Sequence, residues 1–343
     1  MEGRTAFVTG ATGLLGGNVT RELVRHGWRV RALVRSPEKA QRLLGDLDVE
    51  LVTQDLANVD AYADSLEGVD TVFHTAAYFR EYYQPGNEWE KMKQINVDAT
   101  MGLLKAAEKR GVRRVVHTSS SGVIETRTAN GDSADESAPF SSFAEENLYF
   151  KTKVLVEQEI AGFLESSHLD VVLILPGWMI GPGDAGPTSA GQLILDLMKG
   201  KLPGVVDGGT SAVDARDVAQ AMITAADKGR RGERYLVAGS LTTLVQIAHT
   251  LEEVTGTPMP KRVIPRPIAM IIAHLSDFIA RITGGVSKMP VAGIKTLSER
   301  VTLSSDKAKR ELGVAFRPLS ETLSDAVAWY RQHGYLAEAQ PGG

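Results

Sequence analysis

The 343-residue sequence predicts a doubly wound α/β fold, with a parallel sheet covered by helices on both faces and a smaller lobe interleaved with it. Three observations lead to this prediction. Short apolar runs alternate with segments of helical spacing across the first half, a glycine-rich turn follows the first run, and the regular pattern weakens after Pro176. The length also exceeds what a single hydrophobic core usually supports, so two lobes are expected.

The apolar runs are short enough to be strands, and the segments between them carry apolar residues at helical intervals. The predicted strands are Thr5–Thr9, Arg29–Val34, Val49–Thr53, Thr71–Thr75, Val115–Thr118 and Val171–Leu175. The predicted helices between them are Asn18–His26, Ser36–Leu44, Asn96–Arg110 and Phe150–Ser166. Strands and helices in this order form βαβ crossovers, which place helices on both faces of a parallel sheet.

A glycine-rich turn, Thr9 to Gly16, lies where the first strand gives way to a helix. Gly10 allows the tight turn, Gly13 lets the backbone approach a pyrophosphate, and Gly16 permits close packing of helix and strand. The remaining residues of the turn and of the helix start, Thr12, Leu14 and Leu15, are expected to contact the same ligand. Glycine spacing alone is a weak signal, but its position after the first strand favours a dinucleotide-binding Rossmann fold.

The domain boundaries follow from this assignment. We expect a dinucleotide-binding domain at residues 1–180 with return segments near 212–240, a smaller substrate-binding lobe at 181–211 and 241–333, and a tail at 334–343. Within these segments Tyr235–Ala238 is a predicted strand and Leu319–His333 a predicted helix. Gly181–Gly191, rich in Gly and Pro, is a predicted loop.

The end of the second predicted strand indicates the type of nicotinamide cofactor. Sites specific for NAD usually carry Asp or Glu there, bonded to the ribose 2′-hydroxyl, whereas this sequence has Arg35. Arg35 can bind a 2′-phosphate, and Arg42 or Lys39 on the next helix can add to it. Arg42 is equally well explained as a surface charge, and Lys39 is better explained as one. The sequence therefore predicts NADP(H), with NAD(H) left open.

Two further strand ends are expected to contact the cofactor. Asp55-Leu56 closes the third strand, where a carboxylate can reach an adenine amino group or cap a helix. Thr75, Ala76 and Ala77 follow the fourth strand, where small side chains let a ligand lie against the backbone. His74 precedes them and is expected to be a core residue and not a catalyst.

Tyr149 and Lys153 are four residues apart, a spacing that puts both on one face of a helix. They follow the glycine turn, and Tyr149 comes 29 residues after Ser120, the middle residue of a serine run, Ser119 to Ser121, at the end of the fifth strand. Neighbouring residues of a strand face opposite ways, so only some of these serines can face the tyrosine.

Taken together, these strings resemble the short-chain dehydrogenase/reductase superfamily in its extended, epimerase/dehydratase-type form, over nearly the whole chain. The strings are Thr9–Gly16, Asp55–Leu56, Asn96–Val97, Thr118–Gly122, Tyr149–Lys153, Leu175–Gly177 and Ile180–Asp184. The chain looks most like the dihydroflavonol 4-reductase-like and 3β-hydroxysteroid dehydrogenase-like branch, because Pro176-Gly177 stands where sugar-nucleotide epimerases commonly have an Arg-Tyr-Phe-Asn type of string.

The resemblance implies a catalytic Ser–Tyr–Lys group made of Ser120, Tyr149 and Lys153. In it the tyrosine exchanges a proton with the substrate oxygen, the lysine binds the nicotinamide ribose and lowers the tyrosine pKa, and Ser120 binds the developing oxyanion. Asn96 matches a residue that steadies the helix behind the lysine. Pro176, Gly177 and Met179 are included among the expected cofactor contacts.

Aromatic residues near two strand ends are candidates for substrate binding, since open α/β sheets bind ligands at the carboxyl ends of their strands. Tyr78 and Tyr82, with Phe79 and Tyr83, follow the fourth strand, and Trp178 follows the sixth. They suit an apolar carbonyl substrate, but they are equally well explained as packing between the lobes. No flavonoid-site string is readable.

Composition limits the partners and the setting. The net charge of −4 offers no broad basic surface for nucleic acid, and the absence of Cys rules out disulfides, Cys-zinc sites and a thiol nucleophile. No metal site is expected. Residues 1–20 lack the pattern of a signal peptide, so cytoplasm is the expected location, and a homodimer is left open.

The apolar stretch Pro267–Ile282 is predicted to be an amphipathic helix that packs its isoleucine stripe on protein, because it is too short and too interrupted to span a bilayer. Docking on a membrane surface is the alternative. The polar side of the stretch has few basic residues, which argues against that alternative.

The sequence thus favours an NADPH-dependent reductase of ketones or aldehydes, or the reverse alcohol oxidation. A nucleotide-sugar epimerase or dehydratase that retains its cofactor is the alternative, and a non-catalytic NADP sensor is disfavoured because Tyr149, Lys153 and the serine are all present.

Overall fold

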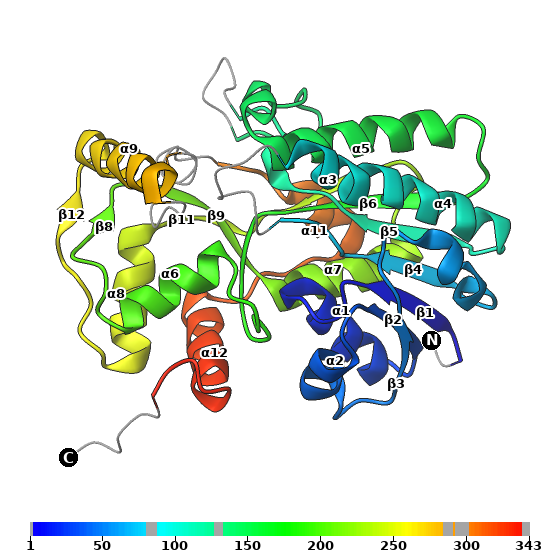
Figure 1. Cartoon of the computed structure of the whole chain (residues 1–343), viewed down its shortest axis with the longest axis horizontal. Coiled ribbons are helices and arrows are strands. Elements are labelled where there is room, and N and C mark those ends of the chain that lie inside the picture. Colours follow the sequence, from blue (N-terminus) through cyan, green and yellow to red (C-terminus); the bar gives the residue numbers. More distant parts are fainter. Residues whose placement is uncertain (1–2, 80–87, 127–132, 284–290, 292–301, 338–343) are drawn as a thin grey trace.

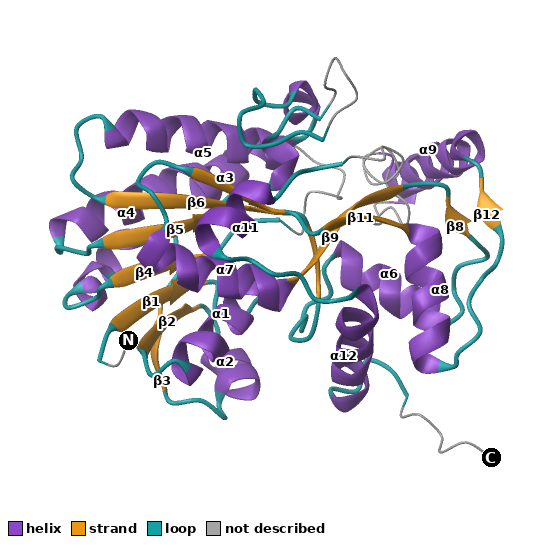
Figure 2. Ribbon diagram, turned by 180° about the vertical axis from the view of Figure 1, so that it is seen from behind, coloured by secondary structure: helices purple, strands orange, loops and turns teal. Residues whose placement is uncertain are grey.

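Seven parallel strands form the central sheet in the order β10-β6-β5-β4-β1-β2-β3, which confirms the predicted fold class (Figure 2). The computed structural model describes residues 3–79, 88–126, 133–283, 291 and 302–337. The strands are β1 Thr5–Thr9, β2 Arg29–Val34, β3 Val49–Thr53, β4 Thr71–His74, β5 Arg114–Thr118, β6 Asp170–Pro176 and β10 Arg234–Val237. The direction of strand order reverses between β1 and β4, and the carboxyl ends of the strands at such a reversal are where open α/β sheets usually bind ligands.

Helices cover both faces of this sheet (Figure 1). On one face lie α1 Leu14–Arg25, α2 Pro37–Leu44, α7 Ala215–Lys228 and α11 Asp306–Leu312; on the other lie α3 Trp89–Lys93, α4 Ala99–Lys109 and α5 Leu148–Leu164. A π-helical turn, Gln94–Asp98, joins α3 to α4. Short 3₁₀ turns lie at Val59–Ala61, Ala63–Leu66, Ser121–Val123 and Ser142–Glu146.

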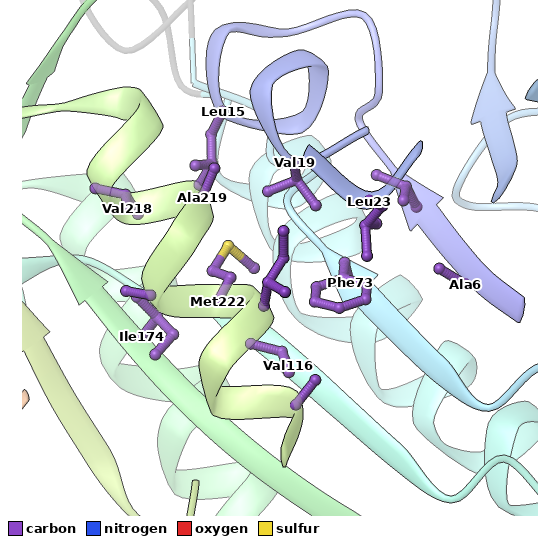
Figure 3. Close-up of a cluster of buried hydrophobic side chains, with 14 of the residues drawn as sticks. Ala6, Leu15, Val19, Leu23, Phe73, Val116, Ile174, Val218, Ala219 and Met222 are labelled. Atoms are coloured by element: carbon purple, nitrogen blue, oxygen red, sulfur yellow. The ribbon is translucent and has the colours of Figure 1, made fainter. Parts of the chain in front are cut away.

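Two apolar cores hold these layers together, one on each face. Along β1, Ala6 and Val8 face the core shared with α1 and α7, whereas Phe7 between them faces the core shared with α4 and α5. This alternation is the ordinary two-residue period of a strand. Figure 3 shows Val19 and Leu23 of α1 and Met222 of α7 packed over the strands.

A smaller lobe lies beside the carboxyl ends of the large sheet (Figures 1 and 2). Its sheet has the order β11-β9-β7, and a second pair joins β8 to β12. Its strands are β7 Trp178–Ile180, β8 Val205–Val206, β9 Gly209–Asp214, β11 Ser240–Thr243 and β12 Val263–Ile264, and its helices are α6 Ser189–Met198, α8 Leu244–Thr255, α9 Arg266–Thr283 and α12 Leu319–Gln332. They share one apolar core, separate from those of the large sheet.

The chain crosses between the lobes several times. We propose a division in which the large lobe consists of residues 3–177, 215–239 and 302–317 and the small lobe contains the rest of the described chain. Three segments differ from the sequence boundaries. β7 belongs to the small sheet, α11 packs on α7 and β10 of the large one, and Tyr335 and Leu336, in the expected tail, pack on the core of the small lobe. All three segments are short, so their periodicity does not reveal which core they join.

The helix predicted at Pro267–Ile282 is present as α9, but the prediction of its packing was wrong. Its buried side chains are Ala269, Ala273 and Ala280, whereas its isoleucines face solvent, with Ile271 69% exposed. Alanines allow closer approach of the helix backbone to the lobe than branched residues would. No helix in the described ranges is long and apolar enough to cross a membrane.

Candidate active site

The glycine turn brings the backbone of β1 close to the end of β4. Gly10 has a φ of +71°, and a Cβ there would lie 2.8 Å from the amide nitrogen of Ala76. A Cβ at Gly16 would lie 2.6 Å from the Thr75 hydroxyl oxygen. A Cβ at Gly16 would also lie 2.2 Å from the carbonyl oxygen of Gly10, so the tight turn and the approach of the two strand ends together exclude larger residues at both positions.

The start of α1 suits an anion. Gly13 is the N-cap residue, and no side chain caps this end of the helix. The side chains of Leu14 and Leu15 are buried, so the backbone amides of the first turn are the groups that can face a ligand. Thr12 is half-buried in the turn itself. These features fit the pyrophosphate of a dinucleotide.

The two arginines expected to select the cofactor are both exposed. Arg35 follows β2 directly, and Arg42 is in the last turn of α2. Between them Ser36 caps α2 by accepting a hydrogen bond from the Lys39 amide at 3.1 Å.

Asp55, after β3, is also exposed, and its carboxylate accepts a bond from the amide of Ala57 at 2.8 Å. Leu56 is buried.

His74 is buried and neutral at the end of β4. The Thr100 hydroxyl donates to the carbonyl of Asn96, so it accepts from His74 Nε2 at 2.8 Å. His74 Nδ1 then accepts from the hydroxyl of Thr9 at 2.7 Å. Burial, and next the charge of Lys153, lowers the pKa of His74 to about 3. This side chain joins two strand ends to α4 and does not titrate near neutral pH.

The same network fixes the segment after β4. The Thr9 hydroxyl accepts from the amide of Ala76 at 3.2 Å, and the Thr75 hydroxyl donates to the carbonyl of Thr9 at 2.7 Å. Ala77 is exposed. Thr75 and Ala76 therefore lie directly against the glycine turn, whereas Ala77 does not.

Tyr149 and Lys153 lie one turn apart on α5. Asn147 caps the helix by accepting from the amide of Phe150 at 3.0 Å. Lys153 is 3% exposed, its ammonium donates to the carbonyl of Thr118 at 2.7 Å, and it lies 5.7 Å from the centre of the Tyr149 ring. Burial lowers the pKa of Lys153 to about 8, with the charge of Glu157 opposing the change.

Ser119 and Ser120 point in different directions, as neighbouring residues of an extended chain do. Ser119 is buried, and its hydroxyl donates to the carboxylate of Glu157. Ser120 is half-buried, and its hydroxyl oxygen accepts from the amide of Gly122 at 3.2 Å. The Ser120 hydroxyl does not donate its hydrogen in that bond. Of the two serines, Ser119 bonds Glu157 and Ser120 does not.

Two residues of this region were missed in the sequence. Glu157 is buried on α5, and its carboxylate lies 3.0 Å from the guanidinium of Arg234, at the start of β10. Burial raises the pKa of Glu157, and the Arg234 charge opposes that rise. The spacing of Tyr149, Lys153 and Glu157, every fourth residue, is the signal that could have found the glutamate.

Asn96 ties α5 to the segment after β4. Its side-chain oxygen accepts from the amide of Tyr78 at 2.7 Å, and its amide group donates to the hydroxyl of Thr152 at 3.1 Å. The Tyr78 ring is buried, with its hydroxyl 3.2 Å from Glu88, and the Phe79 ring lies 4.8 Å from that of Tyr149. Tyr82 and Tyr83 lie outside the described residues.

The carboxyl end of β6 leads directly into the smaller lobe. Pro176 is buried at the end of the strand, and the amide of Gly177 donates to the carbonyl of Val237 at 3.1 Å. Trp178 packs on the core of the small lobe and donates to Ser189 at 3.2 Å, whereas Met179 packs on the large lobe. These residues therefore lie where the two lobes meet.

Within the described residues, no group of three His, Asp or Glu side chains is placed to hold a metal ion.

Comparison with known proteins identifies the family. A model of the NAD dependent epimerase/dehydratase family matches residues 6–238. The chain belongs to this family. It is 36% identical to sterol demethylase protein B of Methylococcus capsulatus, over 97% of this chain and 100% of that protein. It is 32% identical to a putative dihydroflavonol 4-reductase of Synechocystis, over 96% and 95% of the two chains.

Solved structures agree with this assignment. The crystal structure of gox2253 has a TM-score of 0.82 and 33% identity, covering 97% of this chain and 99% of that one. A nucleoside-diphosphate-sugar epimerase from Pseudomonas aeruginosa has a TM-score of 0.77 at 24% identity, which shows a shared fold alone. As a member of the epimerase/dehydratase family, the chain is an NAD(P)-dependent enzyme of the extended short-chain dehydrogenase/reductase class, and the predicted resemblance is confirmed.

Proposed function

We propose that the enzyme uses NADPH to interconvert a carbonyl group and a secondary alcohol of a small organic substrate, with Tyr149 as the proton donor and acceptor. The observation that carries this proposal is the buried ammonium of Lys153, 5.7 Å from the Tyr149 ring and bonded to the end of β5 two residues before Ser120. A cation in this position favours the tyrosinate form.

The roles of the three side chains follow from their chemistry. A phenol ordinarily titrates near 10, so Tyr149 needs a nearby positive charge to exchange a proton at neutral pH. Lys153 supplies that charge, and its ammonium would also donate a hydrogen bond to the nicotinamide ribose. The Ser120 hydroxyl binds the substrate oxygen and holds the carbonyl in position. Bound nicotinamide supplies or accepts the hydride.

The cofactor site fits a dinucleotide, and Arg35 supports the choice of NADPH. Its guanidinium is exposed directly after β2, where an NAD-type site would carry a carboxylate. Arg42 is on the following helix and is a second candidate for the 2′-phosphate. The uncapped start of α1 would hold the pyrophosphate through its amides.

An apolar, ring-bearing substrate is favoured by the residues around Tyr149 and by the relatives. Phe79 packs against Tyr149, and Trp178 lies where the lobes meet. The relatives include a sterol demethylase protein B and a ketoreductase of a farnesylated dihydroquinoline oxide from Stigmatella aurantiaca. Their names support a ketone or alcohol on a largely apolar skeleton.

A carbonyl and alcohol panel, followed by nicotinamide absorbance with NADPH and NADH in parallel, tests the proposal. We expect stoichiometric oxidation of NADPH with one or more apolar ketones, and slower reaction with NADH. Conversion of a nucleotide sugar with no net absorbance change would indicate an epimerase instead. Tight NADPH binding without turnover of any member would favour a sensor.

A further inference from the structure

One helix carries most of the exposed apolar surface of the described chain. Ten large hydrophobic side chains are exposed in the described residues, and seven of them lie on α9. The seven are Ile268, Ile271, Ile272, Leu275, Phe278, Ile279 and Ile282. Scattered exposed apolar residues are normal in proteins, but a contiguous group of this kind usually marks an interaction surface.

The seven side chains form one stripe along the whole helix, which is about 27 Å long at 1.5 Å per residue. The opposite side of α9 is fixed to the small lobe by buried Ala269, Ala273 and Ala280. Asp277, the sole acidic residue of the helix, accepts from the amide of Val291 at 3.3 Å. The stripe therefore contains no acidic residue.

A basic group precedes the stripe. Lys261, Arg262 and Arg266 are exposed, and none of them forms an ion pair with another described residue. The carbonyl of Arg262 accepts from the amide of Val205 at 3.0 Å, so β12 fixes this flank to the lobe. The first turn of α9 has no acidic residue, and the positive end of its dipole adds to the three cations. The chain as a whole carries a net charge of −4, so this positive region is local.

We propose that α9 and its basic flank dock the enzyme on membranes that contain anionic phospholipid, with the helix lying in the plane of the interface. In such a membrane the acyl chains can bury the apolar stripe, and the negative headgroups can bind the three cations. Both contacts lie near the same depth of the interface, so a helix parallel to the membrane can make them along its full length. Figures 1 and 2 show α9 at the outer edge of the small lobe, away from the seven-stranded sheet. A helix in this position can meet a flat surface without disturbing the rest of the fold.

Vesicle co-sedimentation tests the proposal and does not depend on the redox activity. Phosphatidylcholine vesicles with phosphatidylglycerol should pellet the protein, and high salt or omission of phosphatidylglycerol should release it. The double variant Ile271→Asn/Leu275→Asn should weaken binding at least about tenfold, because it removes two apolar side chains from the interface. Val245→Asn, at an exposed apolar position of α8, is the matched control and should bind like wild type.

The charge variant Lys261→Glu/Arg262→Glu should weaken binding to anionic vesicles, whereas Lys199→Glu/Lys228→Glu, at exposed lysines elsewhere, should have a smaller effect. All substitutions are at exposed positions, and circular dichroism with NADPH binding verifies that each variant is folded. The proposal is overturned if wild type stays in the supernatant, or if it binds neutral and anionic vesicles equally. A third result would also overturn it: light scattering shows that wild type is a dimer and that the α9 variant is a monomer, and neither protein binds vesicles.

Discussion

At the residue scale, the proposed chemistry depends on burying one cation. The buried Lys153 ammonium donates to the carbonyl of Thr118, and burial lowers the pKa of Lys153 to about 8. It therefore stays mostly protonated at neutral pH, which is the form that favours a tyrosinate at Tyr149. The neighbouring imidazole of His74 is kept neutral by the same burial, so Lys153 does not face a second positive charge.

Tyr149→Phe should reduce turnover by about 10²- to 10⁴-fold, the usual contribution of a general acid or base. The phenyl ring can keep the contact with Phe79, so NADPH affinity should remain close to wild type. Steady-state kinetics and a fluorescence titration of NADPH measure the two effects. Turnover close to wild type would exclude Tyr149 as the proton donor.

Arg35→Asp should shift the cofactor preference toward NADH. The substitution removes a cation from the 2′-phosphate and places a carboxylate where it can accept from a free 2′-hydroxyl. The ratio of kcat/KM for NADPH and NADH measures the shift, and Arg25→Asp, at an exposed arginine of α1, serves as the control. An unchanged ratio would mean that Arg35 does not contact the phosphate.

At the element scale, α5 arranges Tyr149, Lys153 and Glu157 in one row, and the last of them connects the row to Ser119 and Arg234. The Glu157 carboxylate raises the pKa of Lys153 against the effect of burial. Glu157→Gln should keep the shape but remove that charge, so the alkaline fall in kcat, which begins when Lys153 loses its proton, should move to lower pH. A pH profile measures this change.

Glu159→Gln, at an exposed position two residues along α5, is the control and should leave the profile unchanged. A merely structural role for Glu157 would lower kcat equally at every pH. A profile of unaltered shape would therefore rule out the proposed effect on Lys153.

The elements also show what sequence patterns can and cannot predict. All seven strands of the large sheet were predicted, because runs such as Arg29–Val34 and Val49–Thr53 are short and rich in Val and Leu. The helix α7 was missed because its buried residues, among them Ala219 and Met222, surround most of the helix and leave little periodicity. The stripe of α9 was recognised, but an amphipathic pattern reveals which residues share a face and not whether protein covers that face. Likewise, strand alternation did not show which of Ser119 and Ser120 faces Tyr149. The family resemblance pointed to Ser120, and the bond from Ser119 to Glu157 separates the two serines in the structure.

At the scale of the whole molecule, buried histidines couple stability to pH. His74 and His117 are both buried in the large lobe with rings 5.1 Å apart, and burial lowers the pKa of each. The folded protein therefore keeps them neutral, whereas the unfolded chain binds protons at both below about pH 6.5. Stability that is fully present above this value should be lost as pH falls toward 3, by about 1.4 kcal/mol per pH unit for each histidine.

His117→Leu should make this loss shallower by about 1.4 kcal/mol per pH unit, because one of the two protonation sites is removed. Neither ring nitrogen of His117 has a hydrogen-bond partner in the described part of the chain, so the substitution leaves no new polar group unpaired. At pH 7 we therefore expect the variant to be at least as stable as wild type. Urea unfolding between pH 6.5 and 4.5 measures the slope above the range in which most carboxylates titrate. His168→Gln, at an exposed histidine, should keep the wild-type slope, and a His117→Leu slope equal to wild type would show that this imidazole is already charged in the folded protein.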